Sequence, residues 1–526
     1  MRRGEIARSV SRGAFYLAIE KIAGLLSGTA YFALLLRWMG PTKYGVMILA
    51  LSFMGLATMV TGNFESYLER FAAEYQARGA MATLRRAQLL TLAIKLALGI
   101  VAAALMLLLA PFLARQFNTP WLAVLIPLLA PMVMLDGLAT TGRSSLYGQQ
   151  RFRAVCMLAV AFHVLKTVMV GLLWYARKGL PELAIGITAL AVAQGVANTL
   201  VPLWSLRGAR DEHPADEPSG IRDLLRSIWR YCLPMLGARA TWVAGQNLVK
   251  VVLGKLVDAA SLGYFSFAFQ TVDRLMELIY PLPSALLPSL TYLVARQERE
   301  RMADIFDQAF RLIQVTACVC AAGLFVFAPE ITRVVGSRLF LPAVPLLRIM
   351  AFLPIARSAY EPMSMLFQAL HRPGAVLSLA LLKFVGEFSG YFLLVPALGM
   401  IGAGWAILGG SAIGYFAALA VLSRLVPEAG SARTRTVFVS LGYTAVVCAV
   451  GWALDRSSPF GWSFVARLMI LPPALLALFA FQLVTGYDMR KLAELPLRTP
   501  WLSRPRDLVV AWGGHLARAL APRRAT

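Results

Sequence analysis

The chain has 526 residues, of which 59% are hydrophobic and 15% are charged, and its mean hydropathy is +0.67. This composition exceeds the apolar content of soluble domains, so it excludes a soluble enzyme and indicates a protein that crosses a membrane many times. The net charge of +24 would suit nucleic-acid binding, but basic loops that touch anionic lipid headgroups account for it, and we expect no nucleic-acid partner.

Apolar runs of about 20 residues predict an all-α polytopic fold with about 14 transmembrane helices. The runs lie near residues 13–36, 44–64, 88–110, 121–142, 154–176, 182–205, 231–253, 261–292, 309–329, 342–368, 374–396, 400–423, 436–454 and 461–486. The first run follows basic residues, as a signal peptide does. Glu20 and Lys21 interrupt it and no small-residue cleavage site follows, so we expect a retained first helix.

The loops between these runs alternate in charge from end to end. Loops on one side carry 32 of the lysines and arginines, and loops on the other side carry 9. The positive-inside rule therefore predicts that both termini lie in the cytoplasm.

A polar stretch at 207–230 divides the chain into halves that look related. The segment from Lys255 to Gly263 follows the seventh run as Arg37 to Gly45 follows the first, at an offset of 218, with the base and the glycine in register. Six-helix repeats in the same orientation are related by an axis along the membrane normal and place substrate at their interface. We therefore predict two pseudo-symmetric six-helix bundles at 1–206 and 231–424, a cytoplasmic linker at 207–230, two additional helices at 436–486 and a basic cytoplasmic tail at 487–526.

Ten basic and six acidic residues fall inside the predicted spans. A charge at the centre of a lone membrane helix costs roughly 2.5 to 3.5 kcal/mol, so most of these groups must face a hydrated cavity. Because the bases outnumber the acids, the cavity should attract an anion, which predicts a transporter for a negatively charged substrate.

The seventh run carries a polar stripe in which Arg239, Gln246 and Lys250 recur at spacings of seven and four. Arginine can bind phosphate or carboxylate in a bidentate manner, and the alternative is structural pairing with acids on neighbouring helices. For Lys383 and Glu387, four residues apart, we favour the structural pair. The residues predicted to bind substrate in the cationic cavity are Lys21, Lys166, Arg239, Lys250, Arg357 and Lys383.

Buried carboxylates can take up a proton or bind a cation, and histidine titrates near neutral pH. The candidates for coupling transport to H⁺ or Na⁺ are Glu20, Asp136, His163, Asp273, Glu277, Glu361 and Glu387. A structural role is the alternative for each of them. The five cysteines lack metal-ligand spacing, so we expect no metal site and no cofactor.

Two alternative functions, a drug antiporter and a membrane glycosyltransferase, would require other sequence features. A cation-coupled drug antiporter would need a cavity dominated by acids. A membrane glycosyltransferase would need carboxylates at an external face, and a membrane ligase would need a substantial extracytoplasmic loop. The outward loops are short, and no phosphate-binding Gly-x-x-x-x-Gly-Lys-Ser/Thr motif is present, so we expect a protein that is not an enzyme.

Three segments carry a family resemblance: Arg37-Trp-Met-Gly-Pro-Thr-Lys-Tyr-Gly45, Arg70-Phe-Ala-Ala-Glu-Tyr-Gln-Ala-Arg-Gly79 and Leu146-Tyr-Gly-Gln-Gln-Arg-Phe-Arg153. They resemble polysaccharide-biosynthesis flippases of the Wzx type, in the superfamily of multidrug extruders and the lipid II flippase. The resemblance implies two six-helix bundles around a cationic lumen in the bacterial inner membrane. It also implies an undecaprenyl-pyrophosphate-linked oligosaccharide as substrate, and a polysaccharide polymerase and chain-length proteins as partners.

Overall fold

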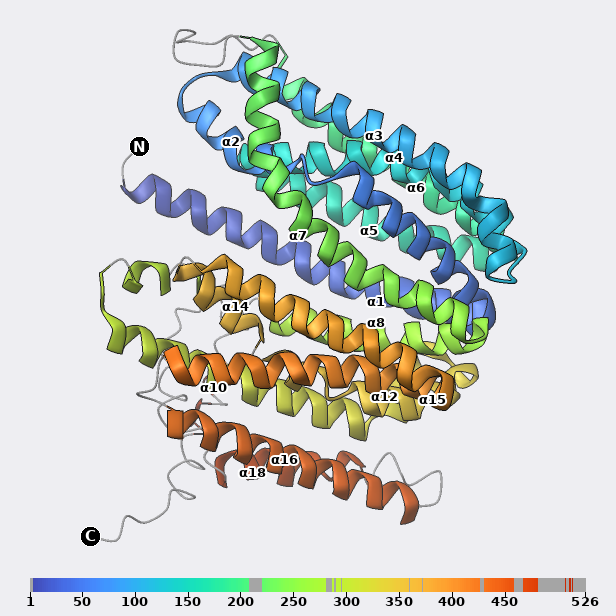
Figure 1. Ribbon diagram of the computed structural model, residues 1–526, viewed down its shortest axis with the longest axis vertical. Coiled ribbons are helices and arrows are strands. Elements are labelled where there is room, and N and C mark those ends of the chain that lie inside the picture. The colour runs from blue at the N-terminus through green and yellow to red at the C-terminus, as the bar shows by residue number, and fades with distance from the viewer. Residues whose placement is uncertain are drawn as a thin grey trace. The chain divides into compact units, whose positions relative to one another are not determined.

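A computed structural model describes residues 3–207, 220–280, 286–287, 290–294, 296–358, 360–370, 372–425, 430–457 and 467–480, with 507, 510–511 and 513. Across these residues the secondary structure is helical (Figure 1). The longer helices are α1 (Arg3–Thr61), α2 (Ser66–Ala77), α3 (Met81–Gln116), α4 (Trp121–Gly148), α5 (Phe152–Tyr175), α6 (Leu180–Ser205), α7 (Ile221–Leu256), α8 (Ala259–Ile279), α10 (Arg299–Val326), α15 (Pro373–Leu425) and α16 (Gly430–Ser457). The shorter ones are α11 (Ala328–Ile331), α12 (Val344–Met350), α13 (Leu353–Ser358), α14 (Tyr360–Ala369) and α18 (Leu471–Ala480), with a π-helix at Thr332–Gly336 and a 3₁₀-helix at Arg338–Ala343.

The chain forms two compact units. Unit 1 comprises Met1–Ser266 with Val335–Phe340, and unit 2 comprises Phe267–Val334 with Leu341–Thr526. The helix α7 packs against α1, α2 and α3 and therefore belongs to unit 1. The division between the units falls after it, inside α8. The helix α7 begins at Ile221, so residues 221–230 of the predicted linker are helical, and residues 208–219 lie outside the described part. The six-helix bundles at 1–206 and 231–424 therefore stay a prediction.

Two of the long helices bend at a glycine. Gly40 in α1 has φ of 65° and is followed by Pro41, while Gly399 in α15 has φ of 57°. Positive φ is accessible to glycine at little cost, and proline cannot donate to the preceding turn. Each bend separates two of the predicted apolar runs, 13–36 from 44–64 and 374–396 from 400–423.

The described residues contain nine helical stretches that are long and apolar enough to cross a membrane. Two of these stretches, Phe15–Thr61 and Gly374–Arg424, contain the bends at Gly40 and Gly399, and each is long enough for two crossings. The predicted seventh and eighth runs correspond to α7 and α8, whereas α18 covers only part of the last one. The protein is thus an all-α, multi-pass membrane protein, and the count of fourteen spans stays a prediction.

Gly45 and Gly263, which are 218 residues apart, make equivalent contacts where α1 crosses α8. A Cβ atom added to Gly45 would lie 1.8 Å from the backbone oxygen of Ala259, and one added to Gly263 would lie 2.1 Å from the backbone oxygen of Pro41. Pro41 and Ala259 are themselves 218 residues apart. A two-fold axis produces this reciprocity, because residue i of one copy then touches residue j of the other and the reverse.

The start of α8 is set by Asp258. Its Oδ2 accepts hydrogen bonds from the backbone N–H groups of Ala260 at 3.1 Å and Ser261 at 3.3 Å, while its Oδ1 accepts the Ser261 hydroxyl at 2.6 Å. These bonds satisfy donors that a helix N-terminus leaves open, and they lower the pKa of Asp258, with the Ser261 hydroxyl as the main cause. The capped turn brings Ala259 and Gly263 to the crossing with α1.

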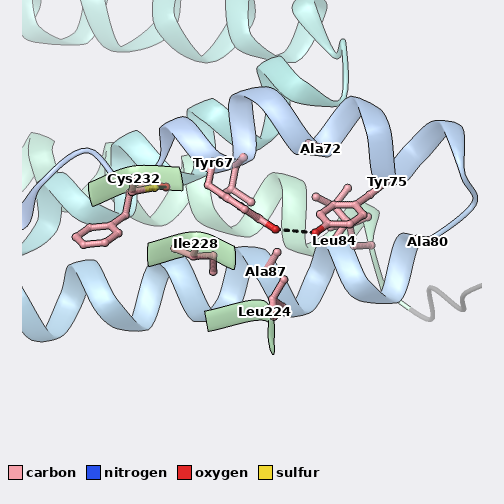
Figure 2. Packing of buried hydrophobic residues seen from close by; sticks show 12 residues of the cluster. Tyr67, Ala72, Tyr75, Ala80, Leu84, Ala87, Leu224, Ile228 and Cys232 are labelled. Carbon is pink, nitrogen blue, oxygen red and sulfur yellow. Dashed lines mark hydrogen bonds between the residues drawn. The ribbon is translucent and has the colours of Figure 1, made fainter. Parts of the chain in front are cut away.

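Each unit has its own packed core. In unit 1, Tyr67 and Tyr75 of α2 lie among Leu84 of α3 and Leu224 and Ile228 of α7 (Figure 2). The two tyrosine hydroxyls are hydrogen-bonded at 2.7 Å, so both remain satisfied although they are buried. In unit 2, the predicted additional helices are represented by α16 and α18, which pack against α10 through a cluster of Val315, Ala322, Val326, Tyr443, Val447, Cys448, Ile470 and Leu478.

Candidate functional site

Helices α1 and α5 carry three of the predicted site residues of unit 1. Lys166 of α5 places its ammonium 4.3 Å from the ring centroid of Tyr31 on α1, which is close enough for a cation–π interaction. Lys166 and Lys21 are both exposed, and His163 lies against Gly24 of α1. Each of these two helices therefore carries one accessible base, while His163 lies at the contact between the two helices.

The polar stripe predicted on α7 lies in unit 1 and packs against α1 and α3. Asn247 lies against Gly55 of α1 and donates to the backbone oxygen of Val243 at 3.0 Å. Arg239 is half-buried and interacts electrostatically with Asp136 of α4, and Lys250 is half-buried as well. The stripe thus gives unit 1 two further bases, Arg239 and Lys250. Arg239 interacts with Asp136, one of the carboxylates predicted for ion coupling.

A buried ion pair joins α3 to the turn before α2. Lys95, whose side chain is 1% exposed, donates to Glu65 Oε2 at 2.6 Å and to the hydroxyl of Thr140 at 2.7 Å. Asp136 interacts electrostatically with both Lys95 and Glu65. Lys95 is one of the ten bases inside the predicted spans. Sequence reasoning missed Glu65, because that carboxylate follows the second span in a turn and meets Lys95 only through tertiary packing.

Glu20 of α1 is bonded to two side chains of α4. Its carboxylate is buried and accepts hydrogen bonds from the guanidinium of Arg143 and, at 3.5 Å, from the hydroxyl of Tyr147, both on α4. The Arg143 side chain is 40% exposed, so the pair is accessible from one side. This is the structural role that the sequence left open for Glu20, and its part in ion coupling stays a prediction.

The predicted site residues of unit 2 form a cluster of mixed charge. Arg357 lies 3.7 Å from Asp273 Oδ1 and 3.5 Å from the hydroxyl of Tyr280. The pair predicted for Lys383 and Glu387 is present, with Nζ 3.7 Å from Oε1, and Glu387 also accepts the hydroxyl of Ser411 at 3.0 Å. Glu361 interacts electrostatically with Lys383 and Arg357. Two bases and three acids thus share this region.

Nine of the ten intramembrane bases fall into two groups, and the tenth, Arg348, lies in unit 2 with its guanidinium 5.3 Å from the ring centroid of Phe325. Five of them contact a carboxylate: Lys95 with Glu65, Arg274 with Glu277, Arg357 with Asp273, Lys383 with Glu387 and Arg467 with Glu330. Four others, Lys21, Lys166, Arg239 and Lys250, lie in unit 1. Four of the six predicted substrate-binding bases therefore lie in unit 1, while the other two, Arg357 and Lys383, lie beside carboxylates in unit 2.

The sequence profile of a family described as "Polysaccharide biosynthesis protein" matches residues 34–345. Stage V sporulation protein B of Bacillus subtilis (strain 168) is 23% identical over 510 residues, which are 91% of this chain and 97% of that protein. The chain thus aligns with a relative over almost its full length.

Two solved transporters share the fold. An inward-facing multidrug resistance MATE family transporter of the MOP superfamily superposes with a TM-score of 0.61 at 14% identity, over 81% of this chain and 99% of the transporter. The lipid II flippase MurJ in an inward closed conformation gives 0.61 at 14% identity, over 88% of this chain and 97% of the flippase. The chain accordingly shares the fold of these two transporters. Because the family profile covers more than half of its length, the chain belongs to the polysaccharide biosynthesis protein family.

Proposed function

We propose that this protein moves an undecaprenyl-pyrophosphate-linked oligosaccharide from the cytoplasmic to the periplasmic leaflet of the bacterial inner membrane. The observation that carries the proposal is the set of bases in unit 1, Lys21, Lys166, Arg239 and Lys250. A pyrophosphate is the anionic part of such a lipid, and arginine and lysine bind it through charge-assisted hydrogen bonds. Membership of the polysaccharide biosynthesis family and the fold shared with a lipid II flippase support this substrate class.

The mechanism follows from the chemistry of the substrate. The bases of unit 1 bind the pyrophosphate while the polyprenyl tail stays in the bilayer, and the sugars pass through the hydrated cavity. Alternation between inward-open and outward-open states then exposes the headgroup on the other side. The membrane potential can drive this movement, since moving one charge through 100 mV is worth about 2.3 kcal/mol.

The proposed orientation places both termini in the cytoplasm, on the strength of the 32 to 9 distribution of bases between the two sets of loops. The protein would then receive its substrate where the lipid-linked sugar is assembled. It would deliver the substrate to a polysaccharide polymerase and chain-length proteins on the other face.

Replacing Lys21 or Arg239 by alanine should lower the rate of flipping by at least about tenfold, because each removes a charge-assisted contact with the pyrophosphate. The measurement is the flipping of a fluorescent undecaprenyl-pyrophosphate oligosaccharide in proteoliposomes. Arg78→Ala is the matched control, since Arg78 forms an exposed pair with Glu74 that contributes little to stability.

A different outcome would overturn the proposed substrate. The fold is shared equally with a multidrug transporter, so the same proteoliposomes should be tested for the expulsion of small organic cations. If the native protein expels cations and moves no lipid-linked sugar, the drug antiporter is the correct function.

Substituting Asp136 by asparagine should make flipping independent of an imposed H⁺ or Na⁺ gradient. Asp136 interacts electrostatically with Lys95, Glu65 and Arg239, so a change of its charge reaches both an ion pair and a proposed substrate ligand. The measurement is the rate of flipping with and without each gradient, and Glu74→Gln on the exposed face of α2 serves as the control. Equal stimulation of Asp136→Asn and native protein would exclude Asp136 as the coupling residue.

A further inference from the structure

A cavity of about 780 Å³ lies in unit 1, and none of the bases discussed above lines it. We call it the basic groove, and it is lined by Trp38, Lys43, Trp174, Tyr175, Arg177 and Lys178. Its residues come from the bend of α1, from the end of α5 and from the turn that leads into α6. The groove is large enough to hold the headgroup of a phospholipid or a sugar phosphate.

The topology of unit 1 places the groove at a surface of the bilayer. The first half of α1 ends at Gly40, one crossing after the N-terminus, and α5 ends at Tyr175 after an odd number of crossings. Both points therefore lie on the side of the membrane opposite to the N-terminus. In the orientation proposed above, this side is the periplasmic one.

The groove contains three bases, although the loops on this side of the membrane carry few bases in all. Lys43, Arg177 and Lys178 are all exposed, and they are three of the nine bases in the loops on this side. Glu182, at the start of α6, interacts electrostatically with Lys178, but its Oε2 also accepts the backbone N–H of Gly179 at 2.9 Å. The groove therefore has a net positive charge, which suits an anion.

The aromatic residues of the groove are unusually exposed. Tyr175 is 90% exposed and Trp174 is 41% exposed, while Trp38 is half-buried. Tyrosine and tryptophan are enriched at membrane interfaces, which would explain the rings alone. A belt of interfacial aromatics requires neither a concave site nor three converging bases, so the combination indicates a ligand with both an anionic part and a ring or apolar part.

The backbone turn that ends α5 positions two bases of the groove. Arg177 has φ of 52°, a left-handed conformation that a residue with a side chain adopts at a cost. The turn begins with the N–H of Ala176 bonded to the oxygen of Leu172, and it directs Arg177 and Lys178 to the end of α5. The same kind of turn ends α3 and α4, where Asn118 and Gln150 have positive φ, and after α5 it places Arg177 and Lys178 beside the cavity.

We propose that the basic groove binds the phosphate-bearing headgroup of a membrane lipid in the leaflet opposite to the N-terminus. Lys43, Arg177 and Lys178 bind the phosphate oxygens, and Trp38, Trp174 and Tyr175 pack against the adjoining ring or chain. This inference goes beyond the transport path, and it rests on the proposed function for the identity of its preferred ligand, the pyrophosphate of the lipid that has been translocated.

The test compares lipid binding by two variants that lose the same charge. The first is Lys43→Ala/Arg177→Ala/Lys178→Ala, and the second is Arg85→Ala/Arg86→Ala/Arg153→Ala, which removes three exposed bases from the other end of the helices. The full-length proteins are titrated in detergent with undecaprenyl pyrophosphate and, separately, with phosphatidylglycerol, and bound lipids are counted by native mass spectrometry. Equal melting temperatures of the two variants establish that both are folded.

We expect the groove variant to bind undecaprenyl pyrophosphate at least about tenfold more weakly than the control variant, with a smaller change for phosphatidylglycerol. Equal losses for the two lipids would support a phosphate site that serves membrane lipids in general. Tyr175→Ala should weaken binding without any change in charge. The proposal is overturned if the groove variant binds both lipids as the control does.

The groove and the proposed function can fail separately. If native protein flips no lipid-linked sugar but the groove variant still loses lipid binding, the groove is a lipid site and the proposed substrate is wrong. If flipping by native protein is observed while lipid binding is unaffected by the groove substitutions, the transport function stands and the groove proposal fails.

Discussion

Replacing Lys95 by methionine should destabilise the protein by about 3 to 5 kcal/mol, the usual cost of leaving one partner of a buried ion pair uncompensated. The methionine fills a similar volume, but Glu65 then loses the donor that lies 2.6 Å from its Oε2. Asp136 loses a positive neighbour as well, although its interaction with Arg239 remains. On the scale known for domains of 150–250 residues, this change lowers the melting temperature by roughly 6 to 20 °C.

The buried cysteines provide the measurement. Cys156 and Cys232 of unit 1 are 5% and 0% exposed, so in a background in which Cys318, Cys320 and Cys448 of unit 2 are replaced by alanine a thiol-reactive dye reports the temperature at which unit 1 opens. Arg86→Met, an exposed substitution on the same helix, is the control and should leave the melting temperature unchanged.

Removing both charges separates the pair from the packing around it. Lys95→Met/Glu65→Met should recover most of the lost stability, because replacing a buried ion pair by apolar residues is often neutral. The recovery should be incomplete, since Asp136 still lacks Lys95. A single Lys95→Met variant that melts with the native protein would show that Lys95 and Glu65 are not paired in a buried site.

Gly45→Ala and Gly263→Ala should each destabilise the protein by about 1 to 3 kcal/mol or more, because the added methyl group overpacks a helix crossing. The new Cβ would lie 1.8 Å from the oxygen of Ala259 in the first variant and 2.1 Å from the oxygen of Pro41 in the second. Both obstacles are backbone atoms, so rotation of a side chain cannot relieve the clash and the helices must separate.

The reciprocity of this crossing predicts how the two substitutions combine. Once one methyl group has separated α1 from α8, the second meets less resistance, so the double variant should lose less than the sum of the single losses. Melting followed with the thiol-reactive dye measures all three variants. Gly245→Ala is the control, because an added Cβ there meets no atom within 4 Å. Strict additivity would contradict the reciprocal contact.

The sequence predicted the helices well because a membrane helix is specified locally. A run of about 20 apolar residues is sufficient to cross the bilayer whatever its neighbours do, so α3, α4, α5 and α6 lie close to the predicted runs. The bend at Gly40 was likewise foreseeable, since a glycine followed by a proline separates two apolar runs. The position of α7 was not, because its packing against α1 depends on contacts between distant segments.

For the candidate site, too, some features follow from the local sequence and others depend on tertiary packing. The sequence by itself determined that this is an all-α, multi-pass membrane protein with more bases than acids inside its helices, because apolar length and charge can be counted without knowledge of the fold. Only the tertiary structure decided that Lys95 is paired with Glu65 while Lys166 lies over Tyr31. An ion pair or a cation–π contact depends on distances of a few ångströms between helices, and helix periodicity specifies which face a residue lies on but not which helix that face meets.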